Sequence, residues 1–582
     1  MVWEVDIMKY KLINEDIKNK NLLDIVYENR NITKDMVEKL LGANSEDYRN
    51  PFEIFGIDKG IKQFKEEISK NNNILIISDS DVDGVCSSCI FYNFLIDDLK
   101  YDKEKVFFHI HTGKQHGITE SVFYNIERHN IKYLIVPDAG TNNLKEMKRL
   151  EEQNVKMLCL DHHQCEIDVN ELPNNVSLIN NQIGNKISQY ASGTLVTAKF
   201  IEAYGYKIDK YYDSIAVSLI ADSMNLLDEE NRGYVNMGLK NIKNPLIKAY
   251  FSKNKINNPI INDVSYNLAN YINALIRVGN QEEKKIMLKA FIGENEVFNY
   301  EKRTGEVIKE TLQERVVRIS NNCKSKQNNA VKKSVEKCNA YINRLHLDKN
   351  KVIIIKNDEN FIDHSQTGLI AMKVADNWKR PCIILNKFND EIYNGSMRSV
   401  GLDNFKEILE KTNLFDWVKG HANASGINIK KENVELLNEK LNELLKDFEV
   451  TDGRIYQVDN IIEINNLNKV DIKNIANLKP LWCSDIKEPL FVIKGIEVES
   501  ANIKMVSKLK CEFKVNNVSF VKNWCSKDFY EKLTLKEQLK FGRSHPLKID
   551  VVCKFSLDKY GKAIVEIVDF KSIKNTSKKI IF

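Results

Sequence analysis

The chain has 582 residues, of which 43% are hydrophobic and 29% charged, and this composition is typical of a soluble globular protein with three or four domains. No apolar run approaches the ~18–20 residues that cross a bilayer, and the first residues lack the basic stretch and apolar run of a secretory signal. The sequence therefore disfavours a membrane or secreted protein, and we expect a cytoplasmic location without membrane contact.

The 11 cysteines are scattered along the chain, as expected for thiols in a reducing compartment. Cys86 and Cys89 have the spacing of a redox or zinc pair, but no second cysteine pair completes a tetrahedral zinc site. Packing of both side chains between a helix and a sheet is the favoured interpretation.

The net charge of +5 is small but unevenly distributed. Residues 481–582 contain 20 Lys and Arg against 12 Asp and Glu, and residues 301–345 contain 11 against 5. Basic surfaces of this kind suit a polyanionic partner. A lysine-rich composition with solvated faces explains either surplus equally well when that surplus is considered alone.

In chain order, residues 1–70 are expected to form an N-terminal segment of short helices, interrupted at Asn50-Pro51. From residue 71 to about 240, apolar runs of strand length alternate with helical segments. That alternation is typical of a parallel sheet with helices on both faces, so we expect an α/β domain over 71–275.

The remaining chain is expected to contain two further domains. Residues 276–349 form a connecting helical region, because 300–345 is charged, free of proline and reads as one extended helix. A second α/β domain follows over 350–450, and then a linker over 451–484. The β-rich runs and turn signals of 485–582 predict a small C-terminal β-barrel.

Acidic residues follow three of the strands expected within 71–275, and a fourth acid follows an apolar stretch. In open parallel sheets the carboxyl ends of the strands meet at one edge, where ligands bind, so we expect these side chains to converge. The residues are Asp79, Asp81 and Asp83 after the first strand, Asp138 after the second, Asp161, His162 and His163 after the third, and then Asp222.

So many carboxylates in one place would repel one another unless cations bind between them. Carboxylate oxygens with one imidazole suit Mn²⁺ or Mg²⁺ better than Zn²⁺ or copper. Two such ions can clamp the attacking and leaving oxygens of a phosphoryl displacement. A turn or helix cap explains any one of these acids equally well, but the four clusters in this order favour a metal centre.

These motifs resemble those of the DHH phosphoesterase superfamily, and more specifically the RecJ family of single-strand-specific 5′→3′ DNA exonucleases. The matching stretches are Asp79–Gly84, Asp138, Asp161–His163 and Ala221-Asp222, with Asn394–Ser399 and Gly420–Gly426 similar to two signatures of the substrate-binding domain found in that family. The resemblance implies a DHH domain, a second α/β domain of the DHHA1 type and a C-terminal OB-fold. It covers nearly the whole chain.

The resemblance also implies roles for the metal-centre residues. Asp79 and Asp81 would hold one ion, Asp83, His162 and Asp222 would hold the other, and Asp138 would bridge both. Asp161 would support these ligands, His163 would contact the scissile phosphate or assist proton transfer, and Arg277 would bind phosphate oxygens. Some relatives carry a histidine where this chain has Ile77, so the ligand set of the first ion departs from theirs.

The substrate-binding domain is expected to hold the 5′ phosphate of the substrate. The candidate residues are Gly395, Ser396, Arg398, His421, Ser425 and Gly426. Lys419 stands where the family has a glycine, and it either touches a phosphate or faces water. His421 either binds the substrate or is satisfied within a turn. In the C-terminal barrel, Phe520 and Trp524 could stack on bases, although a core position is favoured for Phe520.

Three functions are compatible with these residues. The favoured one is a monomeric exonuclease on single-stranded DNA in repair or recombination, using Mn²⁺ or Mg²⁺, with a helicase or single-strand-binding protein as a further partner. A hydrolase of short oligonucleotides or cyclic dinucleotides is disfavoured by the length and the basic C-terminal region. A non-catalytic replication scaffold is disfavoured because the complete set of metal ligands is present.

Overall fold

The computed structural model describes residues 8–16, 20–113, 115–185, 188–448, 455–507, 509–534 and 546–572. The chain divides into two compact units. We call the unit of Asp35–Asn329 and Leu481–Asp485 the central unit, and the unit of residues 1–34, 330–480 and 486–582 the outer unit. None of the described helices combines the length and the apolar content needed to span a membrane.

The central unit is built on a five-stranded sheet in which every neighbouring pair of strands is parallel. The strands, in spatial order, are β3 (Val106–Ile110), β2 (Ile74–Ser78), β4 (Tyr133–Pro137), β5 (Lys156–Asp161) and β6 (Val176–Asn180). Both neighbours of β2 come later in the chain, so the direction of winding reverses between β2 and β4. In sheets of this kind a crevice opens at that reversal, outside the carboxyl ends of the strands.

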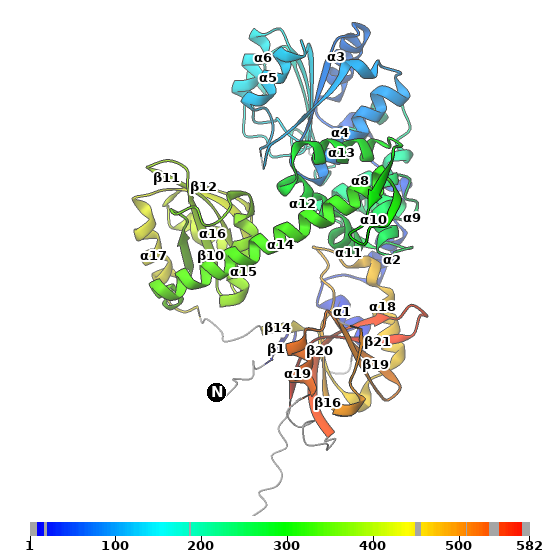
Figure 1. Ribbon diagram of the computed structural model, residues 1–582, viewed down its shortest axis with the longest axis vertical. Helices are drawn as coiled ribbons and strands as arrows, with labels where there is room; N and C mark the ends of the chain where they lie inside the picture. The colour runs from blue at the N-terminus through cyan, green and yellow to red at the C-terminus, as the bar shows by residue number, and fades with distance from the viewer. Residues whose placement is uncertain are drawn as a thin grey trace, which may run out of the picture. The chain divides into compact units, whose positions relative to one another are not determined.

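Helices cover both faces of this sheet, with α5 and α6 on one side and α3 on the other (Figure 1). The helices of the sandwich are α3 (Ile57–Ser69), α4 (Val82–Asn93), α5 (Glu120–Arg128), α6 (Leu144–Glu152) and α7 (Gly193–Tyr204). Alternate residues of each strand pack into the two cores, since Ile74 and Ile76 join one and Leu75 and Ile77 the other. Burial on both faces explains why the strands are continuously apolar.

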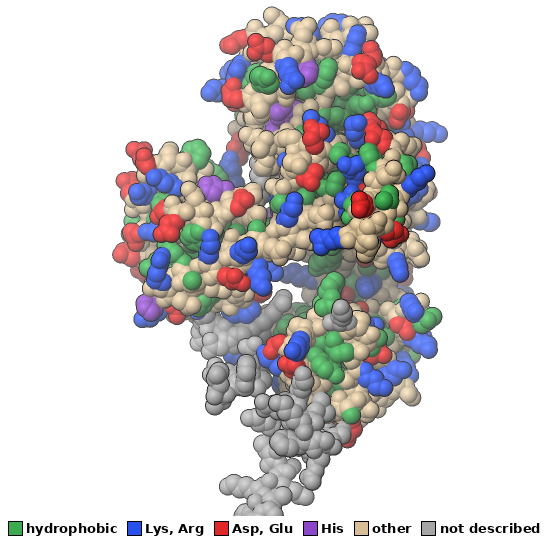
Figure 2. Space-filling view, viewed as in Figure 1, with side chains coloured by type: hydrophobic (Ala, Val, Ile, Leu, Met, Phe, Trp, Pro, Cys, Tyr) green, Lys and Arg blue, Asp and Glu red, His purple; other side chains and the backbone are tan. Residues whose placement is uncertain are grey.

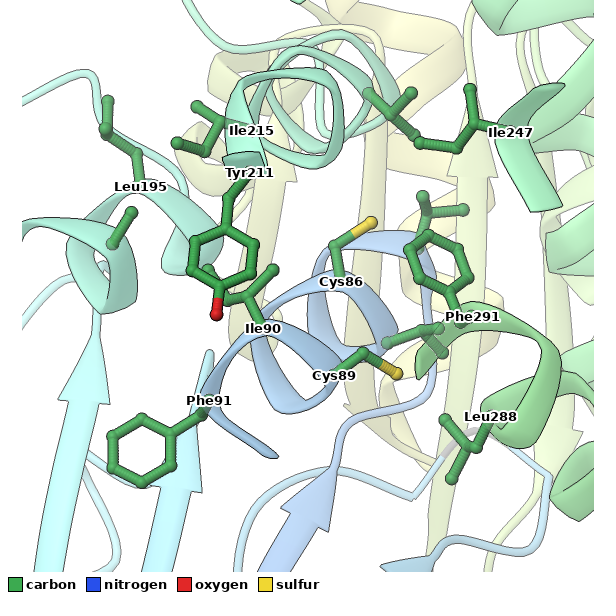
Figure 3. Close-up of a cluster of buried hydrophobic side chains, with 14 of the residues drawn as sticks. Cys86, Cys89, Ile90, Phe91, Leu195, Tyr211, Ile215, Ile247, Leu288 and Phe291 are labelled. Carbon is green, nitrogen blue, oxygen red and sulfur yellow. The ribbon is translucent and has the colours of Figure 1, made fainter. Parts of the chain in front are cut away.

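The paired cysteines of α4 lie inside this core (Figure 3). Cys86 and Cys89 are free thiols that are almost completely buried among apolar side chains such as Ile90 and Phe291. Burial raises the pKa of both thiols above the ordinary value, which disfavours the reactive thiolate. The packing interpretation of this pair is confirmed.

The rest of the central unit is mainly helical. Its elements are α2 (Lys34–Gly42), α8 (Tyr212–Ala221), α9 (Glu229–Lys240), α10 (Pro245–Lys253), α11 (Ile261–Val264), α12 (Asn270–Val278) and α13 (Gln281–Ile292), followed by the hairpin of β7 (Val297–Glu301) and β8 (Val307–Thr311). The long helix α14 (Leu312–Leu345) follows the hairpin. The helix expected over 300–345 therefore begins twelve residues later, because the hairpin occupies the residues before it. Phe298 and Tyr300 of the hairpin stack on Arg315 and Arg318 of α14.

The N-terminal part of the outer unit contains a strand where helices were expected. Strand β1 (Lys9–Leu12) precedes α1 (Leu22–Glu28) and pairs in parallel with β14 (Ile455–Val458). A strand partner more than 400 residues away leaves no local signal in the sequence, so the expectation of helices throughout 1–70 is wrong here. The region expected as a linker, 451–484, contains β14, β15 (Asn460–Glu463) and α18 (Lys469–Asn477).

The outer unit contains the expected second α/β domain. Its sheet has the order β12 (Phe415–His421), β13 (Ala424–Lys430), β11 (Ile392–Arg398), β10 (Cys382–Lys387) and β9 (Ile353–Lys356). Helices α16 (Phe405–Lys411) and α17 (Asn433–Leu444) pack on one face, and α15 (Thr367–Trp378) packs on the other. The candidate substrate residues of the sequence lie on its strands β11, β12 and β13.

The C-terminal region forms a seven-stranded OB-like β domain. Its strands, in spatial order, are β15, β16 (Phe491–Glu499), β20 (Pro546–Leu557), β21 (Ala563–Ser572), β19 (Val518–Asn523), β18 (Lys510–Val515) and β17 (Lys504–Ser507), with α19 (Lys527–Thr534) after β19. Phe520 is buried and stacks on Phe513, as expected for a core residue, whereas the side chain of Trp524 is 81% exposed. The predicted α/β fold class with a C-terminal β domain is confirmed.

Basic and acidic side chains are interspersed on the face of the molecule that Figure 2 shows. Among the described residues, that face has no extended patch of one sign. On this face the basic surpluses of the sequence are consistent with solvated lysines.

Candidate metal centre and substrate face

The carboxyl ends of β2, β4 and β5 bring the acidic motifs of the central unit together. Asp79 follows β2, Asp138 follows β4 and His162 follows β5, on either side of the point where the winding reverses. Three groups of side chains have ligand atoms within 4.8 Å of one another: Asp79 with Asp81 and Asp138, Asp83 with His162 and Asp222, and Asp138 with His162 and His163. Asp138 therefore belongs to groups on both sides of the centre.

The first acidic motif is held by the start of helix α4. Asp81 is the N-cap of this helix, and its carboxylate accepts a hydrogen bond of 3.0 Å from the N–H of Gly84. A Cβ at position 84 would lie 2.7 Å from the Cα of Asp79, so only glycine permits this close approach. Burial and the charges of Asp79 and Asp83 raise the pKa of Asp81 to about 6.

The N-terminus of α7 fixes the carboxylate of Asp83. This carboxylate accepts hydrogen bonds from the N–H groups of Gly193 and Thr194, at 2.7 and 2.8 Å, and from the hydroxyl of Thr194 at 2.5 Å. The first turn of a helix carries unsatisfied N–H groups and a partial positive charge, which suits an anionic side chain. A Cβ at residue 193 would lie 2.7 Å from the Cα of Asp138, so this contact also requires glycine.

The imidazole of His162 lies between three carboxylates. Its Nε2 is 3.2 Å from Oδ1 of Asp138, 3.6 Å from Oδ2 of Asp222 and 3.8 Å from Oδ2 of Asp83. Burial lowers the pKa of His162, with the charge of Asp83 acting in the opposite direction, so the ring favours the neutral form that binds metal ions.

Asp138 and Asp222 carry the features of a carboxylate cluster that lacks counter-charge. Asp138 has a left-handed backbone, with φ 62°, and its buried Oδ1 accepts no hydrogen bond, although Nε2 of His162 lies 3.2 Å away. Burial and the neighbouring acids raise the pKa of Asp138 well above its usual range and that of Asp222 to about 8. A divalent cation would remove this cost and satisfy the orphaned oxygen, so the residues fit a Mn²⁺ or Mg²⁺ centre.

Asp161 is buried next to the metal-binding groups, and both of its carboxylate oxygens have hydrogen-bond partners. Its carboxylate accepts hydrogen bonds from the N–H groups of Thr141 and His162 and lies 2.8 Å from Nδ1 of His163. Burial would raise the pKa of Asp161, but its bond to His163 outweighs this effect and holds the pKa well below its usual range. Burial would likewise lower the pKa of His163, but Asp161 raises it to about 9. The pair therefore places a protonated imidazole beside Asp138.

Arg277 of α12 lies within electrostatic reach of the centre. Burial lowers the pKa of its guanidinium, and the charge of Asp81 acts in the opposite direction, which places the two groups within electrostatic reach. Its Nε is buried and has no hydrogen-bond partner. The central unit thus brings together all nine residues that the sequence assigned to the metal centre and its chemistry.

The six candidate substrate residues of the outer unit fall on two faces of the second sheet. Ser396, Arg398 and Gly426 share one face, and His421 lies opposite Ala424 on the same face. Gly395 alternates with the buried residues Tyr393 and Met397 and therefore shares their face. The Ser425 hydroxyl donates a hydrogen bond to the carbonyl of His421. Some of the six candidates are thus available to a ligand, whereas Gly395 and Ser425 contribute to the packing and hydrogen bonding of the strands.

Comparison with known proteins agrees with these features. Residues 73–224 match the model of the DHH family, N-terminal domain. The chain is 29% identical over 597 aligned residues to a protein of Bacillus subtilis strain 168 that is named as a prophage-derived single-strand DNA-specific exonuclease, YorK, with 99% of this chain and 100% of the relative covered. It is 24% identical over 526 residues to the single-stranded-DNA-specific exonuclease RecJ of the same strain, covering 88% of this chain and 63% of RecJ.

Among solved structures, RecJ from Thermus thermophilus in complex with Mn²⁺ matches with a TM-score of 0.67 and 16% identity, covering 95% of this chain and 76% of that one. The shared fold extends over both units of the chain. The chain is therefore similar to RecJ proteins, and its residues 73–224 match the DHH family.

Two histidines of this RecJ-like chain lie beside the first metal-centre group and were not anticipated from its sequence. Nδ1 of His116 is 2.6 Å from Oδ2 of Asp79, and Nε2 of the buried His111 is 3.8 Å from the other oxygen of that carboxylate. Both follow β3, the neighbour of β2 in the sheet. The sequence signal was the run of three histidines His109, His111 and His116 at the end of a strand and after it, which contains no acid and was therefore passed over. Ile77 is buried in β2, so the histidines near Asp79 come from another strand.

Replacing His116 by Ala is expected to weaken Mn²⁺ binding about tenfold, because hydrogen bonds that orient a metal ligand are typically worth that much or more. Isothermal titration of the RecJ-like protein with Mn²⁺ measures this affinity. His129→Ala is the matched control, since that ring stacks on Phe107 away from Asp79. Equal affinities for both variants and the wild type would show that His116 has no part in holding Asp79.

Proposed function

We propose that this chain is a metal-dependent exonuclease that hydrolyses single-stranded DNA from its 5′ end, and that it serves DNA repair or recombination. The observation that carries the proposal is the pair of ligand groups joined by Asp138, with a buried and unpartnered carboxylate oxygen between them. The relatives named above act on single-stranded DNA according to their names, and this supports the choice of substrate.

In this proposal the ligand groups hold two Mn²⁺ or Mg²⁺ ions. When bound, such ions acidify water and offset the charge that grows on the phosphoryl oxygens. One ion would be held by Asp79, Asp81 and Asp138, and the other by Asp83, His162, Asp222 and Asp138.

The other groups of the centre act on the substrate directly or position the ligands. His163, whose Nδ1 is held by Asp161, donates a hydrogen bond to a phosphate oxygen or a proton to the leaving 3′ oxygen. Arg277 offers a guanidinium to phosphate oxygens. The N-terminus of α7 orients the carboxylate of Asp83. No nucleophilic side chain is needed.

Binding of the 5′ phosphate is assigned to the second sheet. Ser396, Arg398 and His421 offer hydrogen-bond donors on one face, and Gly426 of the same face makes room for the ring of Trp417. Gly395 and Ser425 support these residues from within the strands. A cytoplasmic location, a monomeric state and contacts with a helicase or single-strand-binding protein complete the proposal as expectations.

The decisive experiment incubates the protein and Mn²⁺ with a single strand several tens of nucleotides long that carries a label at its 3′ end. The same strand within a duplex and an Asp138→Asn variant are the controls. We expect a ladder of progressively shorter labelled fragments from the single strand and the wild-type protein only.

Other outcomes favour the alternatives. Intact long strands together with hydrolysed dinucleotides would favour an enzyme of short oligonucleotides. The absence of turnover on both substrates in Mn²⁺ and Mg²⁺ would favour a non-catalytic scaffold. A ladder from a 5′-labelled strand without one from the 3′-labelled strand would mean that hydrolysis proceeds from the 3′ end instead.

A further inference from the structure

One half of one face of the second sheet presents side chains to solvent in three regular rows. The opposite face is covered by α16 and α17, while α15 and the end of α14 pack on the β9 and β10 side of this face. Strands β13 and β12 continue the face beyond those helices, and β11 lies at their edge, where the guanidinium of Arg398 is close to Gly368 of α15. Paired across the three strands, the rows are Asn394–Asn428–Trp417, Ser396–Gly426–Lys419 and Arg398–Ala424–His421.

The central strand of these rows carries almost no side chain. Gly426 and Ala424 lie between the polar residues of β11 and the long side chains of β12. A Cβ at residue 426 would lie 3.4 Å from the six-membered ring of Trp417, so this ring extends over the backbone of β13. The Trp417 side chain is nonetheless 39% exposed. A large flat ring is thus held against glycine with part of its surface open to a ligand.

The chemistry around the ring suits a nucleotide. Among the nine paired positions the basic residues are Arg398, Lys419 and His421, and none of the nine is acidic. The amide of Asn428 donates a 2.6 Å hydrogen bond to the carbonyl of Asn394. Because each amide has two hydrogens and a carbonyl, this bond leaves a donor and an acceptor at the end of the row beside Trp417. Basic groups for phosphate, a flat ring and paired amide groups occur together on one face.

We propose that this face is a base-binding subsite, in which Trp417 stacks on an unpaired base while Arg398 and Lys419 bind the neighbouring phosphates. The proposal rests on the proposed function and extends it to the origin of strand selectivity. Stacking on an aromatic side chain is open to any base whose face is free. Inside a duplex both faces of each base are occupied by neighbouring bases, so stacking on Trp417 selects against the interior of a double strand and tolerates sequence.

Binding of single strands with and without bases tests this role. Fluorescence anisotropy in EDTA, where no hydrolysis occurs, would compare oligodeoxythymidylate with an abasic oligomer of equal length and charge. Trp417→Ala is expected to weaken binding of the thymidylate about tenfold or more, the range found for base–aromatic stacking, and to leave binding of the abasic strand unchanged. Trp417→Phe should retain most of the affinity, because a phenyl ring also stacks.

Two further variants keep the test decisive. Phe388→Ala removes an aromatic side chain of the same domain that is 67% exposed and lies outside the three rows, so it should not change either affinity. Trp417→Leu keeps an apolar cover on the strand without a stacking ring, and it replaces the alanine variant if that variant fails to fold. Equal losses on both oligomers, or no loss on either, would overturn the proposal.

The hydrolysis ladder separates this subsite from the proposed function. A wild-type ladder together with unchanged thymidylate binding by Trp417→Ala and Trp417→Leu would reject the subsite and leave the exonuclease standing. Base-dependent binding through Trp417 without any ladder would reject the exonuclease and leave a base-binding face.

Discussion

Replacing Asp138 by Asn is expected to lower the rate of single-strand hydrolysis by about a thousandfold. Asp138 belongs to the ligand groups on both sides of the centre, so one substitution weakens the hold on both ions. Even groups that only orient a metal ligand typically contribute ~10–100-fold, and a carboxylate shared by two ions should contribute more. Asparagine tolerates the left-handed backbone of residue 138 better than alanine does, so the fold should persist.

Single-turnover kinetics on a labelled strand measures this loss, and calorimetric titration with Mn²⁺ measures the number of bound ions. We expect the titration to fall from two ions to fewer than two. Asp168→Asn is the matched control, because Asp168 caps a short surface helix and leaves the centre untouched. A variant that retained a rate within tenfold of wild type and bound two ions would remove Asp138 from the centre.

The acidic motifs could be located from the sequence because a parallel sheet imposes a strong rule. Continuous apolar strands must be covered on both faces, and their carboxyl ends then meet at one edge. Asp79, Asp138 and His162 each follow such a strand, so their proximity needed no knowledge of distant contacts. The two glycines that admit the close approaches, Gly84 and Gly193, lie at helix starts and carry no comparable signal.

The features that the sequence did not reveal depend on contacts between distant segments or on side-chain direction. Strand β1 is defined by a partner near residue 455, and His116 meets Asp79 only because β3 lies beside β2. The motif around Ser396 reads as one stretch, although alternate residues of a strand face opposite ways. Trp417 could not be separated from a core tryptophan until its ring was known to lie over Gly426 of the neighbouring strand.

Removing the metal is expected to destabilise the protein more at pH 8 than at pH 6. In the folded, metal-free centre the pKa of Asp81 is about 6 and that of Asp222 about 8, and the pKa of Asp138 is raised well above its usual range. The pKa of an unfolded Asp is ~3.9. Between these values the folded state binds more protons than the unfolded state, so the free energy of unfolding falls as pH rises through the folded pKa values.

Bound cations replace those protons, and their affinity rises over the same interval because the ligands must be ionised. The difference between the melting temperatures in Mg²⁺ and in EDTA should therefore widen from pH 6 to pH 8, by roughly 1–2 °C for each kcal/mol of repulsion relieved in a unit of this size. Differential scanning fluorimetry in one buffer series measures both curves, so the titration of groups far from the centre cancels in the difference. An Asp138→Asn, Asp222→Asn double variant should flatten the widening, since two of the three raised carboxyls are then absent. A gap that narrowed towards pH 8 would mean that the acids are compensated within the protein itself, and that the orphaned oxygen of Asp138 has a partner other than a cation.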